Sequence, residues 1–70
     1  MTIREIEGLS GLTRANIRFY ESEGLLQPRR LPNGYRDYSD DNLETLKKIK
    51  LLRQLHIPLD EIRALQAGEH

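Results

Sequence analysis

The sequence contains no cysteine among its 70 residues. This absence excludes disulfides, a thiolate metal site and a thiol nucleophile. The only histidines, His56 and His70, are isolated, so we expect no metal and no other cofactor. Long apolar runs are also missing: no segment is long enough to cross a bilayer, and residues 1–5 show no apolar signal region. We therefore expect a cytoplasmic protein without a membrane partner.

Net charge is absent as well, because 11 basic and 11 acidic residues balance. This balance counts against a strongly basic nucleic-acid binder, since phosphate contacts supply most of the non-specific affinity. The distribution is nevertheless uneven. Residues 14–38 contain five arginines and three acidic residues, whereas residues 57–70 contain one arginine and three acidic residues. The middle of the chain is therefore basic and the tail is acidic.

No residue pattern predicts an enzyme. Ser10 and Ser39 have no base beside them in the sequence and are explained as turn or cap residues. Asp40 and Asp41 are placed to interact with a helix dipole, and no glycine-rich loop for phosphate is present. A chain of 70 residues allows one domain, which we assign to residues 1–70.

The first third of the chain predicts two short helices joined by a tight turn. Thr2 and Glu5 form a capping box, so a helix should run to about Glu7 or Leu9 until Ser10 and Gly11 break it. A second helix, capped by Thr13, should cover residues 14–23 and end at Gly24. The side chains expected to face inward are Ile3, Ile6 and Leu9, then Ala15 and Ile17 with help from Phe19 or Tyr20.

The middle of the chain predicts a small β-hairpin. Pro28 and Pro32 argue against a continuing helix, and Asn33-Gly34 is a strong hairpin-turn signal. We expect Leu25 and Leu26 to pair with residues 35–38 as two short strands. These strands would form a wing with arginines on or near its arms.

The last part of the chain predicts two further helices. Ser39 caps the first, and His56, Ile57 and Pro58 stop it. The second begins near Leu59 and ends at Gly68. The order is α-α-β-β-α-α, a mainly α fold with a small two-stranded wing. The expected apolar stripes are Leu43, Leu46, Ile49, Leu52 and Leu55 on one helix, and Leu59, Ile62 and Leu65 on the other.

Two motifs at a fixed separation make the chain resemble the MerR family of bacterial regulators. Further matching positions extend this resemblance from Thr2 to about Leu65. The matching residues are Thr2-Ile3-Arg4-Glu5-Ile6, Gly11-Leu12-Thr13, Ile17-Arg18-Phe19-Tyr20-Glu21, Gly24-Leu25-Leu26, Pro28, Asn33-Gly34-Tyr35-Arg36-Asp37-Tyr38-Ser39, Leu43 and Leu59-Asp60-Glu61-Ile62.

The resemblance implies an N-terminal winged helix-turn-helix domain that binds promoter DNA. Members of the family distort double-stranded promoter DNA so that RNA polymerase can engage both of its contact elements, which makes polymerase an indirect partner. They also carry a dimerisation helix and an effector region after this domain. We therefore expect a fragment of a longer, homodimeric regulator acting at the bacterial nucleoid.

The predicted DNA contacts lie on the second helix and the wing. Arg18 is placed to bind a guanine edge or a phosphate, Arg14 lies one turn before it, and Asn16 is placed to read adenine. On the wing, Arg36 is placed beside the phosphate backbone. Tyr35 and Tyr38 flank it at odd separation, so one of them should face the core. The full predicted set is Thr13, Arg14, Asn16, Arg18, Tyr20, Arg36 and Tyr38.

Less specific interpretations stand beside these. In the alternative interpretation, Arg18 is a solvated helix residue paired with Glu21 or Ser22. Phe19 lacks a hydroxyl and is interpreted as a packing residue. Two other functions also fit: a small excisionase-like factor that shapes DNA, and a protein-interaction module that binds no DNA. Zero net charge supports the last of these. A salt titration separates it from the others, because binding through several phosphates weakens steeply with salt.

Overall fold

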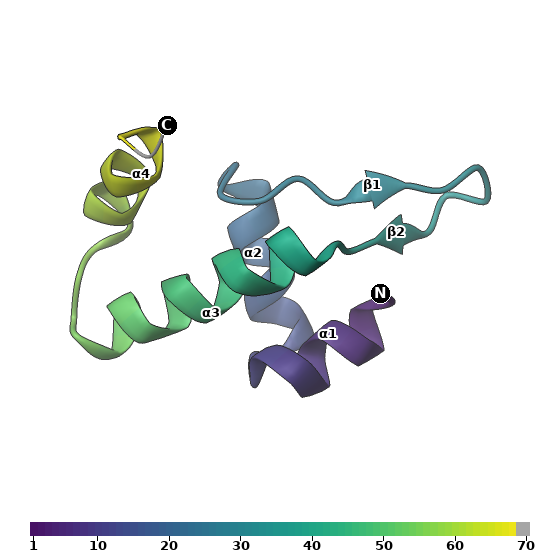
Figure 1. Cartoon of the computed structure of the whole chain (residues 1–70), viewed down its shortest axis with the longest axis horizontal. Coiled ribbons are helices and arrows are strands. Elements are labelled where there is room, and N and C mark those ends of the chain that lie inside the picture. Colours follow the sequence, from purple (N-terminus) through teal and green to yellow (C-terminus); the bar gives the residue numbers. More distant parts are fainter. Residues whose placement is uncertain (69–70) are drawn as a thin grey trace.

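The structure, a computed structural model, describes residues 1–68. Glu69 and His70, the second of the two histidines considered above, lie outside the described residues. The order of elements is the predicted one, with a two-stranded antiparallel sheet between two pairs of helices (Figure 1). The elements are α1 (Ile3–Ser10), α2 (Arg14–Ser22), β1 (Arg29–Arg30), β2 (Arg36–Asp37), α3 (Asp40–Gln54) and α4 (Leu59–Ala67).

Local capping bonds begin the first two helices where the sequence predicts. The Thr2 hydroxyl accepts from the Glu5 N–H at 3.1 Å, and the Glu5 carboxylate accepts from the Thr2 N–H at 2.9 Å. The bond from the Thr2 N–H stabilises the charged carboxylate and so lowers the pKa of Glu5. Thr13 caps α2 by accepting from the Asn16 N–H at 3.2 Å. Both predicted caps are therefore confirmed.

The turn between α1 and α2 depends on one glycine and one carboxylate. Gly11 ends α1 with φ +74°, in the left-handed region that favours glycine. Glu7 of α1 then accepts from the backbone N–H of Arg14 at 2.9 Å, which satisfies a free donor at the start of α2. The Glu7 side chain of α1 therefore caps α2 and helps to fix the relative orientation of the two helices.

The wing forms as a hairpin, but its first strand is not the predicted one. Arg29 pairs with Asp37, and Arg30 pairs with Arg36. The prediction that Leu25 and Leu26 form this strand is wrong: both are buried in the loop after α2. Their burial leaves the exposed arginines to form the strand that projects from the helical body (Figure 1).

The tip of the wing follows the predicted turn chemistry. The Gly34 N–H donates to the Leu31 carbonyl at 2.9 Å, and the Leu31 N–H donates to the Tyr35 carbonyl at 2.8 Å. Gly34 has φ +88°. A proline at the first turned position and a glycine at the left-handed position are the combination that a three-residue hairpin loop needs.

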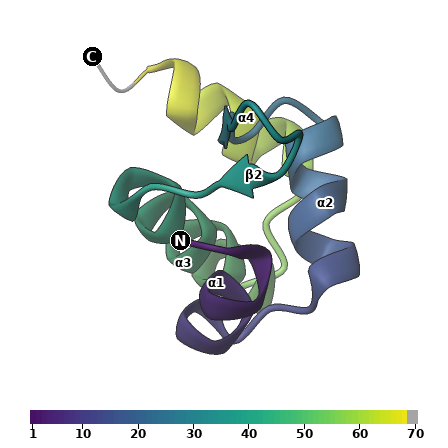
Figure 2. The ribbon, with the colours of Figure 1, turned by 90° about the vertical axis from the view of Figure 1, so that its right-hand side faces the viewer.

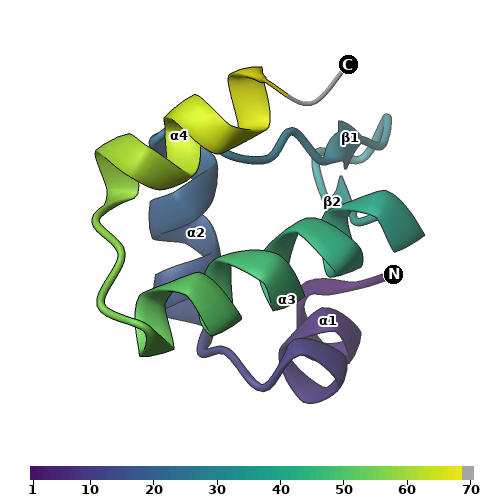
Figure 3. The same cartoon turned by 60° about the vertical axis from the view of Figure 1, so that its left-hand side comes forward.

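The core is small and draws on every helix. Figure 3 shows α4 beside one end of α2 and α3 crossing the other end. The buried side chains come from all four helices, the loop after α2 and the residue after β2. Two side chains of α4 join it to the end of α2: Arg63 donates to the Glu23 carbonyl at 3.0 Å and Gln66 to the Leu25 carbonyl at 3.1 Å. The buried apolar residues are Ile6, Ile17, Tyr20, Leu25, Leu26, Tyr38, Leu46, Ile49 and Ile62.

Several side chains predicted to face inward are exposed instead. A domain this thin leaves the ends of each apolar stripe without a covering layer, since no further element packs over them. The prediction is wrong for four residues of the stripes, which are Leu9, Ala15, Leu55 and Leu65. Phe19 was also expected to pack inward, but it is 48% exposed. The centre of each stripe, from Ile6 to Ile62, is buried as predicted.

The end of α3 holds the one strained backbone position among the described non-glycine residues. His56 has φ +62°, the left-handed conformation that glycine usually provides. Its N–H donates to the Arg53 carbonyl at 3.0 Å, and the Ile57 N–H donates to the Leu52 carbonyl at 3.1 Å. This pattern is a Schellman motif, in which the strained residue reverses the chain so that Ile57 packs against the core.

Replacing His56 with glycine should therefore stabilise the domain. Glycine adopts this φ without the clash that a Cβ causes, so we expect His56→Gly to raise the free energy of unfolding by about 0.5–1 kcal/mol. Denaturant unfolding measures the difference. His56→Ala is the matched control, because it removes the imidazole and keeps the strained Cβ; an equal gain from alanine would contradict the explanation.

Candidate nucleic-acid interface

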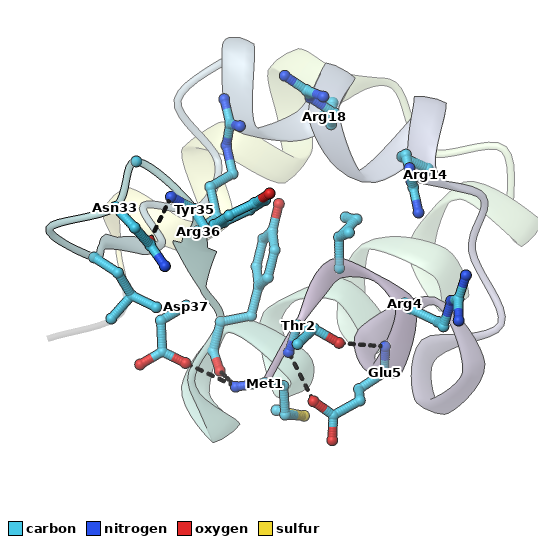
Figure 4. A pocket seen from close by; sticks show the side chains of 14 residues that line it. Met1, Thr2, Arg4, Glu5, Arg14, Arg18, Asn33, Tyr35, Arg36 and Asp37 are labelled. Atoms are coloured by element: carbon cyan, nitrogen blue, oxygen red, sulfur yellow. Dashed lines mark hydrogen bonds and ion pairs between the residues drawn. The ribbon is translucent and has the colours of Figure 1, made fainter.

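A groove lies between the start of α1, the outer side of α2 and the wing. It has a volume of about 690 Å³. Figure 4 shows arginines on several sides of this groove, with Arg4 on α1, Arg14 and Arg18 on α2, and Arg36 on the wing. Helix α2 and the wing thus share one concave face.

The two arginines of α2 point to this groove because they lie one turn apart. Residues at i and i+4 share a helix face. The Arg14 guanidinium lies 3.5 Å from the Glu7 carboxylate and stays 55% exposed. Arg18 is exposed and makes no hydrogen bond or ion pair with any of residues 1–68. The alternative pairing of Arg18 with Glu21 or Ser22 is therefore wrong, and its guanidinium is available to a ligand.

Arg36 is fixed in place by Glu21. Its Nε lies 2.8 and 2.9 Å from the two carboxylate oxygens of Glu21, and the two side chains are 22% and 19% exposed. This bond raises the pKa of Arg36 by stabilising its charged form. Because only Nε is used, the two terminal nitrogens of the guanidinium remain for another partner. The ion pair joins the last turn of α2 to β2.

The buried side chain of Tyr38 contacts the carboxylate of this ion pair. Its side chain is 1% exposed, and its hydroxyl lies 3.4 Å from Glu21 Oε1. Tyr35 is 71% exposed, so the prediction that the two tyrosines face opposite sides is confirmed. The burial of Tyr38 does not support a direct DNA contact. Tyr38 lies beside Glu21 and helps to hold the carboxylate that fixes Arg36 in the groove.

The amino group of Met1 closes the far end of the groove. It donates to Asp37 Oδ1 at 2.9 Å and to the Tyr38 carbonyl at 2.6 Å, while the Tyr38 N–H donates to the Met1 carbonyl at 2.8 Å. Figure 2 shows the N-terminus beside β2 and α3. These bonds hold the base of the wing against the start of α1.

The groove is basic although the chain is neutral. Four arginines line it against two carboxylates, Glu5 and Asp37. Both carboxylates are already engaged, one in the capping box of α1 and the other with the Met1 amino group. Concentrated positive charge in a concave surface raises the local concentration of anions. The uneven charge along the sequence therefore becomes a spatial polarity.

The structure brings together four of the seven predicted contact residues. Arg14, Arg18, Arg36 and Tyr38 line the groove. Thr13 caps α2, and Tyr20 is 8% exposed with its ring in the core. Asn16 is exposed, but at 100° per residue it lies roughly 160° around α2 from Arg18, so it faces away from the groove.

Other groove residues were not among the predicted contacts, and three of them have long or polar side chains that face a ligand-sized space. These three are Arg4, Asn33 and Tyr35. Arg4 carried a signal, because a basic residue in the first turn of a helix opposes the helix dipole. Asn33 accepts from the Tyr35 N–H at 3.1 Å and shapes the tip of the wing. Tyr35 gave a signal only in combination with Tyr38, because one of the two had to be exposed.

Other kinds of site were also considered. Among residues 1–68, no group of three or more histidine, cysteine, aspartate or glutamate side chains is placed to hold a metal ion. None of the described helices combines the length and the apolar character needed to cross a membrane. The groove is thus the site that the chemistry of the described residues singles out.

Comparison with known proteins gives a consistent result. The sequence profile of the MerR HTH family regulatory proteins matches residues 1–69. The chain is 41% identical to the HTH-type transcriptional regulator CueR of Yersinia pestis, over 100% of this chain and 51% of that protein. The chain therefore spans about half the length of the curated relatives it matches.

Solved structures show the same fold. The transcription regulator PbrR691 from Ralstonia metallidurans CH34, in complex with lead(II), superposes with a TM-score of 0.89 at 38% identity, over 96% of this chain and 53% of that one. HiNmlR, described as a MerR family regulator lacking the sensor domain and bound to promoter DNA, gives a TM-score of 0.87 at 27% identity, over 93% and 50% of the two chains.

The environment of Tyr38 predicts a loss of stability at alkaline pH. Burial raises the pKa of its hydroxyl, and the charge of Glu21 acts in the same direction. An unfolded tyrosine ionises near pH 10. Because the folded pKa is higher, the stabilisation is fully present below about pH 10 and is lost as the pH rises through the folded value. We expect the free energy of unfolding to fall in this range, and Tyr38→Phe to flatten the fall.

Urea unfolding between pH 7 and 11 measures this effect. Tyr35→Phe is the matched control, because Tyr35 is exposed and should leave the wild-type profile unchanged. An equally steep loss in Tyr38→Phe would show that another group is responsible.

Proposed function

The chain belongs to the MerR family of HTH regulatory proteins, and we propose that it binds duplex DNA at promoters and regulates transcription by distorting that DNA. The observation that carries this proposal is the arginine-lined groove between α2 and the wing. A helix of this size enters the major groove, and the flanking strand of phosphates then lies beside the wing.

The arginines of the groove have different roles in this proposal. Arg18 has no partner among residues 1–68 and is the candidate for base contact, with Arg14 beside it. Arg36 is held by Glu21 and offers its terminal nitrogens to a phosphate. Such a fixed guanidinium loses little freedom on binding, which favours a contact that positions the protein without reading sequence.

The remaining predicted residues stay part of the proposal with supporting roles. Thr13 lies at the start of α2, and its hydroxyl, which accepts from the Asn16 N–H, can donate its own proton to a phosphate oxygen. The Tyr20 hydroxyl would contact a phosphate oxygen while the ring stays in the core. Asn16 would contact only DNA that reaches the other side of α2. Tyr38 acts through Glu21 and Arg36.

Distortion of DNA follows from the use of two such domains. We propose that the chain works as part of a longer homodimeric regulator, since the CueR relative described above is about twice its length. Two recognition helices at a fixed separation bind two half-sites, and a duplex whose half-sites do not match that separation must bend or untwist. RNA polymerase would then respond to the altered DNA, at the nucleoid, without any contact from this domain.

The alternative of a module that binds only protein has less support. The four arginines of the groove place like charges on one concave face, and an anionic partner such as DNA would offset their repulsion. The excisionase-like alternative shares the fold, but the relatives compared above are named as transcriptional regulators.

Substitution of Arg18 and Arg36 tests the assigned roles. We expect Arg18→Ala to weaken binding of a selected duplex by about 1–3 kcal/mol and to relax the sequence preference at one position. Arg36→Ala should weaken all duplexes by a similar factor. Fluorescence anisotropy with a panel of single-base variants measures both. Wild-type affinity in both variants would remove the assignment.

Arg36 also stabilises the fold, so its test needs a matched variant. Glu21→Gln breaks the same ion pair but keeps the guanidinium. If Arg36 contacts phosphate, Arg36→Ala should lose more affinity than Glu21→Gln. Lys47→Ala, which removes a charge on α3 outside the groove, should bind as wild type.

The dimeric context predicts weak binding by the 70-residue chain alone. One domain reads one half-site, whereas two linked copies gain from a raised effective concentration. We expect a flexible tandem fusion to bind a duplex with two selected half-sites about 10²-fold more tightly than the single chain. A duplex with one half-site is the control. Tight binding of the single chain at physiological salt would contradict the need for a partner.

A further inference from the structure

We propose that Arg4, in the first turn of α1, is a DNA phosphate anchor that forms the wall of the groove opposite Arg36. This inference rests on the proposed function and extends it to a residue and an element outside the recognition helix and the wing. The DNA strand that lies beside the wing would be held from both sides, by α1 and by β2.

The first support is the lack of a protein partner for Arg4. The side chain is exposed and lines the groove. It makes no hydrogen bond or ion pair with any residue from 1 to 68. Its acidic neighbour Glu5 is engaged with the Thr2 N–H at 2.9 Å. Arg4 is therefore not explained as half of a surface ion pair.

The second support is the position of Arg4 in its own helix. It is the second residue of α1, next to the positive end of the helix dipole. A cation at this position is unfavourable for the helix, whereas Glu5 beside it is favourable. The charge of Arg4 thus opposes the stability of α1. A negatively charged ligand near the same helix end would reverse that effect.

The third support is the relation between Arg4 and the other arginines. In Figure 4, Arg4 lies near Arg14 at one side of the groove, and Arg36 lies across from it, beyond Arg18. In a helix-turn-helix the first helix crosses the phosphate backbone while the second enters the major groove. Arg4 is the cation of α1 that lines the groove. Its role is therefore to position the domain on the duplex, and base reading stays with α2.

Salt dependence of binding tests this role. A phosphate contact contributes about 0.9 to the slope of log K against log salt concentration. We expect Arg4→Gln to lower this slope by about one and to weaken binding about five- to tenfold at 0.1 M salt, equally for a selected duplex and for a scrambled one. Arg4→Lys keeps the charge and should retain the wild-type slope.

Controls separate this inference from the proposed function. Lys47→Gln makes the same charge change on α3, outside the groove, and should leave slope and affinity unchanged. Thermal unfolding confirms that each variant folds. Two results would overturn the anchor role: a wild-type salt slope in Arg4→Gln, or a loss of affinity that differs between the two duplexes. In either case, binding of DNA by the wild-type protein would still support the proposed function. Failure of both the single chain and the tandem fusion to bind either duplex overturns both proposals.

Discussion

The ion pair between Glu21 and Arg36 is the constraint on which the geometry of the groove depends. It joins the last turn of α2 to β2, two segments that share no regular secondary structure. Both side chains are about one-fifth exposed, so water screens the pair only in part. A hydrogen bond to a charged group in such a setting contributes on the order of 1–2 kcal/mol. That is a large share of the stability that a domain of this size has.

Besides this pair, other polar bonds fix the relative positions of elements that the small apolar core does not fix by itself. Glu7 links α1 to α2, the Met1 amino group links α1 to the wing, and Arg63 links α4 to the end of α2. Each tether ends on a backbone group or a charged partner, so each is directional. Apolar burial holds the helices together, whereas these bonds set where the wing and α2 lie relative to each other.

The same pair explains why two distant motifs occur together. Glu21 ends the first motif, and Arg36 lies in the second, 15 residues further along the chain. In the folded domain these two residues form an ion pair, and the Tyr38 hydroxyl contacts its carboxylate. The guanidinium of Arg18 remains outside it and keeps its freedom. Arg36 therefore both holds the structure and lines the groove, whereas Arg18 lines the groove without a protein partner. This gathering of arginines on one face explains how a neutral chain presents a basic surface.

By itself the sequence determined the order of elements and the starts of the first three helices. Capping by Thr2, Thr13 and Ser39 acts over three residues, so such signals are readable without a fold. The turn at Asn33 and Gly34 is equally local. The family motifs extended this reading to the winged helix-turn-helix and to most of the arginines that line the groove.

Only the tertiary structure decided the partners and the exposure of individual side chains. Whether Leu65 is covered, which residues pair with β2 and whether Arg36 binds Glu21 depend on contacts between segments far apart in the chain. Arg4 joins the groove for the same reason, because its position relative to the wing is set by the Met1 amino group and the packing of α1. Local propensity carries no information about such long-range contacts, whose free energy arises only when the whole domain folds.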